Sequence, residues 1–160
     1  MSKKNNYNFK KELKKDWYLL ILIVVMFIVS IVVYSDLPDK MPVHRNLEGE
    51  VDNYTGRFWG AFMMPLINIG ILLLMLLTPL IDPRKENYSK FGSSYRIIKS
   101  FLIIFFTFLH FIVLGYALGY NLDIGRIVVL IIALLFLVIG IHLPRICHNY
   151  FLVNTRPSIL

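Results

Sequence analysis

The residue types best suited to bind a ligand are concentrated in one short segment, residues 35–57. Carboxylates and a histidine alternate there with an amide and a tyrosine, and the candidate ligand-binding residues are Asp39, His44, Asn46, Glu48, Glu50, Asp52 and Tyr54. Calcium loops also use alternating oxygen ligands but follow a fuller pattern, and a catalytic zinc usually takes more than one His or Cys. We therefore expect a hydrogen-bonded loop whose side chains contact a ligand, with a bound metal as the alternative.

Two further polar residues, Asn68 and His110, stand inside strongly apolar stretches. A titratable side chain within a membrane span is a candidate functional residue, because charging it there is costly. The simplest interpretation is a neutral His110 hydrogen-bonded to a neighbouring helix, with Asn68 as a candidate partner. A ligand site, a proton relay or a metal site is the alternative, although no span supplies a carboxylate for a relay. The chain contains no recognisable catalytic set, so we expect neither enzymatic activity nor a cofactor.

The elements that position these residues must be membrane helices. Of 160 residues, 57% are apolar and 17% charged, and the mean hydropathy is +0.64, which excludes an ordinary soluble domain. Four apolar stretches, 17–34, 58–81, 100–120 and 127–143, approach or exceed the roughly 20 residues that a helix needs to cross a bilayer. Only helices satisfy their own backbone hydrogen bonds in lipid. We expect an all-α integral membrane protein with four transmembrane helices and a structured extracellular loop between the first two.

The basic residues predict the orientation of these helices. Thirteen of the 17 lie in residues 1–16, 82–99 and 144–160, whereas four lie on the other side of the membrane. Cytoplasmic segments carry such an excess, so those three segments are expected to be a cytoplasmic tail, loop and tail. The helix pairs would then be 17–81 and 100–143, with loop 35–57 outside. The net charge of +7 thus indicates topology and contact with membrane lipid, and we expect no direct binding of nucleic acid.

Two patterns within the spans suggest packing and a second function. Pro65 and Pro79 predict a kink in the second span, and a kinked helix can line a cavity. A small transporter or export subunit that uses this helix and His110 is therefore the alternative function. Gly115 and Gly119 have the spacing that lets membrane helices approach closely, which favours helix packing or a homo-oligomer.

The loop also resembles a known family. Leu37-Pro38-Asp39, followed by Pro42-x-His44-x-Asn46-x-x-Gly49-x-x-Asp52-x-Tyr54, is similar to the opening domain of the SdpI immunity-protein family. A second similarity lies in Pro144-Arg145, Asn149-Tyr150-Phe151 and Thr155-Arg156-Pro157. The family usually has Arg before Thr in the last motif and a glycine where this chain has Val153.

This resemblance implies a multi-pass protein of the bacterial cytoplasmic membrane that protects its cell from a secreted peptide toxin. Such protection can be joined to signalling through a cytoplasmic regulator, which would be a second partner. Because family members often continue into further helices, a form shortened at its C-terminal end is expected. The predicted function is therefore immunity to a secreted peptide toxin, or sensing of it, through the outer loop and the nearby helix ends.

Overall fold

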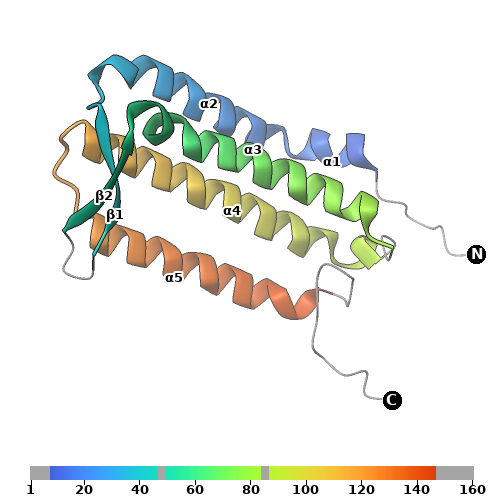
Figure 1. The fold of residues 1–160 in the computed structure, drawn as a ribbon. Helices are drawn as coiled ribbons and strands as arrows, with labels where there is room; N and C mark the ends of the chain where they lie inside the picture. Colours follow the sequence, from blue (N-terminus) through green and yellow to red (C-terminus); the bar gives the residue numbers. More distant parts are fainter. Residues whose placement is uncertain (1–7, 47–49, 84–86, 147–160) are drawn as a thin grey trace, which may run out of the picture.

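The computed structural model describes residues 8–46, 50–83 and 87–146, which form a bundle of four long helices (Figure 1). These helices are α2 (Trp17–Val33), α3 (Arg57–Ile81), α4 (Tyr88–Ala117) and α5 (Ile124–His142). Each coincides over most of its length with a segment that is long and apolar enough to cross a membrane. The chain is therefore a multi-pass, all-α membrane protein, as the sequence predicted.

Shorter elements lie at the two ends of the bundle. They are α1 (Phe9–Lys15), the 3-10 turns η1 (Tyr34–Asp36) and η3 (Leu143–Arg145), and the strands β1 (Lys40–Arg45) and β2 (Val51–Gly56). The two strands cross one end of the bundle, and α1 lies at the opposite end (Figure 1). The hairpin and α1 thus mark the two faces that would emerge from a membrane.

The segment between α2 and α3 is an antiparallel hairpin, which the sequence analysis did not predict. Its pairing begins with Lys40 opposite Gly56 and becomes irregular on both sides of His44. Proline has no backbone N–H to donate to a neighbouring strand. Pro42 is tolerated in β1 because both strands of a two-stranded sheet are edge strands, where an N–H can face away from the partner strand. The prolines and glycines of this segment argue against a central strand, but they do not exclude a hairpin of edge strands.

The core of the bundle is the seam where α2, α3 and α4 meet. Leu19, Ile23, Leu72, Leu76 and Ile103 form one buried cluster there. By contrast, α5 packs mainly against α4, and Leu135 is its one buried residue. Most of the exposed residues of α5 are large and apolar, as expected of a helix in contact with lipid.

Two boundaries differ from those predicted. Helix α4 begins at Tyr88, so much of segment 82–99, which was expected to be a loop, is helical. Helix α1 occupies part of the tail 1–16.

Helix α3 runs continuously from Arg57 to Ile81 with both of its prolines inside. Non-helical backbone angles occur instead at Phe91 of α4, where φ is −123° and ψ is 16°.

Candidate ligand-binding site at the hairpin

Buried apolar contacts fix the hairpin to the end of the bundle. Leu37 and Met41 are buried in one cluster with Ala61 of α3 and Leu114 of α4. Met41 lies against Gly60, where an added Cβ would come within 2.9 Å of the Met41 Cβ. Only a glycine permits this approach, because any other residue would place its Cβ against Met41. Apolar residues of this segment thus pack on the helix ends.

The base of the hairpin is closed by Asp39 and Arg57. The Arg57 guanidinium donates to Asp39 Oδ1 at 2.7 Å, and the Arg57 backbone N–H donates to the Asp39 carbonyl at 3.0 Å. The guanidinium carbon also lies 5.7 Å from the ring centre of Tyr34. Although Asp39 is paired, its side chain is 91% exposed, so its carboxylate stays open to an incoming cation.

At the other end of the hairpin, the predicted polar residues bond mainly to one another. His44 Nδ1 lies 2.6 Å from Asp52 Oδ1. Asn46 acts as a turn residue, accepting from the Glu50 backbone N–H at 2.8 Å and donating its own N–H to the Glu50 carbonyl at 2.9 Å. Glu48 lies outside the described residues. Within the described ranges, no three His, Cys, Asp or Glu side chains come together as a metal site.

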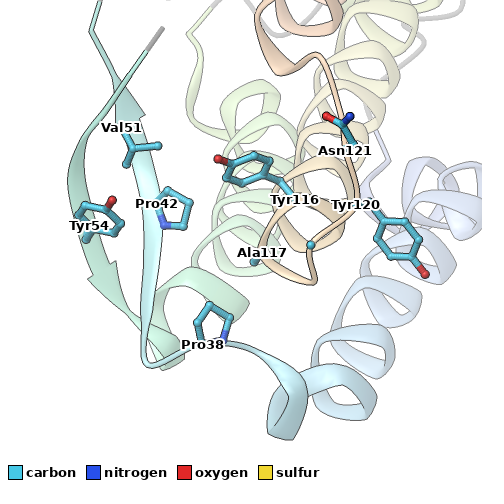
Figure 2. Close-up of a pocket in the computed structure, with 9 residues that line it drawn as sticks. Pro38, Pro42, Val51, Tyr54, Tyr116, Ala117, Tyr120 and Asn121 are labelled. Carbon is cyan, nitrogen blue, oxygen red and sulfur yellow. The ribbon is translucent and has the colours of Figure 1, made fainter.

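A pocket of about 450 Å³ lies between the hairpin and the turn that joins α4 to α5 (Figure 2). Pro42, Val51 and Tyr54 line it from the hairpin, and Tyr116 and Ala117 line it from α4. The Tyr116 ring projects from α4 toward the hairpin (Figure 2). Of these five residues, Tyr54 was predicted from the sequence to contact a ligand, and Pro42 was noted only as part of the loop motif.

The turn that completes the pocket depends on Gly119. Its φ of +90° is a conformation that glycine adopts without steric cost. The Tyr120 N–H donates to the Gly115 carbonyl at 3.1 Å, and the Gly119 N–H to the Tyr116 carbonyl at 3.0 Å, as at many helix ends. From the sequence, Gly119 was expected to help helices pack closely. In the structure it ends α4, because a glycine after the last helical turn is also a signal for the end of a helix.

The hairpin belongs to a segment with known relatives. Residues 21–69 match DUF1648, a domain of unknown function. The DUF1648 segment runs from α2 through the hairpin into α3, and this domain occurs in SdpI-like membrane proteins. No curated protein and no solved structure matches the chain.

The DUF1648 segment meets α4 at His110, which lies buried in the bundle. His110 Nε2 is 3.1 Å from Ser30 Oγ, and the Ser30 hydroxyl donates to the Ala61 carbonyl at 2.7 Å. Ser30 has one hydroxyl proton, which it donates to the Ala61 carbonyl. The hydrogen bond between Ser30 and His110 must therefore use a proton on His110 Nε2. His110 is thus hydrogen-bonded to a neighbouring helix, as predicted, through Ser30.

Asn68 makes a separate set of bonds in the same seam. Its side-chain amide lies 3.1 Å from Thr107 Oγ1 and 3.2 Å from the Ile103 carbonyl. The expected pairing of Asn68 with His110 is therefore wrong. Asn68 hydrogen-bonds to α4 through Thr107 and Ile103, whereas His110 hydrogen-bonds to Ser30 of α2. Both side chains are fully buried, and neither lines the hairpin pocket.

The end of the bundle opposite the hairpin holds charged residues that the sequence analysis did not single out. Asp16 and Lys99 form a buried ion pair. Glu12 bonds Lys15 at 2.6 Å and Arg96 at 3.1 Å. Burial alone would raise the pKa of Glu12, but the hydrogen bonds from Lys15 and Arg96 lower it below its ordinary value. These contacts join α1 and the start of α2 to α4.

Proposed function

We propose that this chain is a bacterial cytoplasmic-membrane protein that confers immunity to a secreted peptide toxin or senses it. The observation that carries the proposal is the DUF1648 hairpin, which is anchored on the bundle and presents polar side chains beside a pocket. With the basic segments in the cytoplasm, the hairpin faces outward and both termini face inward. An arriving toxin would then meet the hairpin before the rest of the protein.

The chemistry of the hairpin supports a peptide as ligand. Exposed carboxylates on Asp39, Glu50 and Asp52 offer contacts to cations, and Tyr54, which is 55% exposed, offers an aromatic surface. The bonded pairs His44–Asp52 and Asp39–Arg57 hold these groups in place without burying them. A preorganised surface of this kind reduces the entropy cost of binding.

A second candidate function is a small transporter or export subunit. One buried acceptor in the described seam, Asn68 Oδ1, has no hydrogen-bond partner there, and such a group can interact with a passing polar solute. The buried His110 lies in the same seam. Flux through proteoliposomes that is abolished by His110→Ala would support transport. Flux that is unchanged in His110→Ala, or absent in the parent protein, would contradict it.

The experiment for the proposed function is survival of a toxin-sensitive bacterium expressing the full chain, challenged with peptide toxin from the chain's own source. The test variant replaces residues 40–56 with a Gly/Ser segment of equal length. The control replaces outward-facing residues of α5, such as Leu130→Ala, at matched membrane abundance. We expect the parent and the α5 variant to protect and the hairpin variant to fail. Protection by the hairpin variant, or none by a correctly inserted parent, would refute the proposal.

A further inference from the structure

We propose that the pocket between the hairpin and the α4–α5 turn binds an aromatic or apolar side chain of a cationic peptide. The basic residues of that peptide would contact the carboxylates of the hairpin. This inference rests on the proposed function, because it assigns the toxin contact to one pocket. It also names residues of α4 and of the α4–α5 turn, which lie outside the DUF1648 segment.

The shape and lining of the pocket fit a large side chain. Its volume of about 450 Å³ lies within the ~300–1,000 Å³ of typical ligand sites. Pro42 and Val51 form an apolar wall facing the ring of Tyr116 (Figure 2). Tyrosine gives a large amphipathic contact surface at low conformational cost, and grooves of aromatic and proline residues accept apolar parts of peptides.

The charge around the pocket favours a cationic partner. The hairpin end carries six acidic residues against four basic ones, whereas the whole chain has a net charge of +7. Among the described side chains, Arg57 pairs with Asp39 and Arg126 with Asp123, and these pairs leave the acidic excess unchanged. Exposed carboxylates directly adjoin lining residues in sequence, with Asp39 next to Pro38 and with Glu50 and Asp52 on either side of Val51. Neighbouring Cα atoms are about 3.8 Å apart, which is shorter than the Debye length of about 8 Å, so these charges contribute to the potential at the pocket.

The position of the pocket favours a peptide that is also amphipathic. Tyr116, Ala117 and Tyr120 of its lining stand where the third membrane span ends. Tyrosines at that level lie among lipid headgroups. A cationic amphipathic peptide adsorbs to this interface, so it can reach the pocket while it remains on the membrane surface.

Binding can be tested with the full chain in nanodiscs of zwitterionic lipid. The probe is a fluorescein-labelled 12-residue peptide of Lys and Leu with one Trp, followed by anisotropy against empty nanodiscs. Val51→Trp fills the pocket from β2, and Asn121→Trp fills it from the α4–α5 turn. Val43→Trp is the matched control, because Val43 is an exposed hairpin residue that does not line the pocket.

We expect saturable binding beyond that to empty nanodiscs, weakened about tenfold in both pocket-filling variants and unchanged in Val43→Trp. A peptide with Glu in place of Lys should bind at least about tenfold more weakly, because it is repelled by the hairpin carboxylates. Equal binding to all three variants, or no binding beyond that to empty nanodiscs, would overturn the inference. A pocket occupied by a lipid headgroup would give the second of these results.

The survival assay separates this inference from the proposed function. Protection by Val51→Trp cells, with protection lost on hairpin exchange, would overturn the pocket assignment and leave immunity standing. Absence of protection in cells with the parent protein would refute immunity, while the nanodisc measurement would still decide whether the pocket binds a cationic peptide. Loss of protection in Val51→Trp but not in Val43→Trp would support both.

Discussion

The two ends of the bundle hold their charged side chains in opposite ways. At the hairpin end, the side chain of Asp39 is 91% exposed, and those of His44 and Asp52 are 65% and 43% exposed. At the other end, the side chains of Asp16 and Lys99 are 0% and 3% exposed. Exposed ion pairs contribute little to stability, whereas a buried ion that loses its partner is strongly destabilising. The buried end therefore fixes α2 against α4, while the hairpin end keeps its charges accessible to a ligand.

The largest expected effect comes from breaking the buried pair. Lys99→Met leaves the Asp16 carboxylate buried without its partner, and we expect the free energy of unfolding to fall by about 3–5 kcal/mol. Unfolding in detergent, followed by circular dichroism, measures the change. The double variant Asp16→Asn/Lys99→Met removes both charges and should recover most of the loss. If the single variant is as stable as the double, the buried pair does not anchor this end.

The next largest effect is on the attachment of the hairpin. In Gly60→Ala the new Cβ meets Met41, and such overpacking typically costs about 1–3 kcal/mol. The loss should be confined to the hairpin and appear as faster hydrogen exchange in residues 40–45 and 51–56. Gly70→Ala is the matched control, because an added Cβ there has nothing within 4 Å. Equal exchange in the two variants would show that Met41 does not hold the hairpin.

Acid should weaken the end of the bundle opposite the hairpin through Glu12. Because the pKa of Glu12 is lowered in the folded protein, its stabilising contribution is complete above the ordinary value of 4.5 and is lost as pH falls through the folded value. Thermal unfolding at pH 6 and pH 3.5 should show a decline that is smaller in Glu12→Gln. An identical decline in both proteins would mean that Glu12 does not stabilise the contact of α1 with α4.

The smallest effect is expected at the base of the hairpin. Asp39→Asn removes an ion pair whose carboxylate faces solvent, and exposed pairs contribute about 0–1 kcal/mol. Thermal unfolding should therefore be nearly unchanged, although binding of the cationic peptide should weaken. A destabilisation as large as that of Lys99→Met would show that the two ends are not energetically different.

The sequence predicted the elements that depend on local composition. The four spans could be located because each needs a long uncharged stretch. Helical spacing also puts His110 on one face with Thr107 and Leu114, and all three are buried. The start of α4 was missed because residues 88–99 are rich in polar residues and resemble a loop. They are helical here because Tyr88, Phe91 and Tyr95 pack together in a buried cluster.

Contacts between distant parts of the chain could not be predicted in the same way. Asp16 and Lys99 are 83 residues apart, so their pairing depends on the packing of α2 against α4. The pocket likewise joins the hairpin to Tyr116 across a gap of more than 50 residues in sequence. Asn68 and His110 were expected to pair because both are polar residues within membrane spans. The packing of α2, α3 and α4 instead gives each of them different neighbours.

The sparse packing of α5 has a consequence for biosynthesis. Because α5 rests mainly on α4 and the core lies among the earlier helices, α2, α3 and α4 can dock with their hairpin while the fourth span is still leaving the ribosome. The Gly119 turn is held by hydrogen bonds to α4, but Asn121 lies three residues before α5, so its place in the pocket wall depends on the insertion of α5. The pocket is thus the last feature to mature, so a nascent chain arrested before α5 would display a folded hairpin that lacks one wall of its pocket.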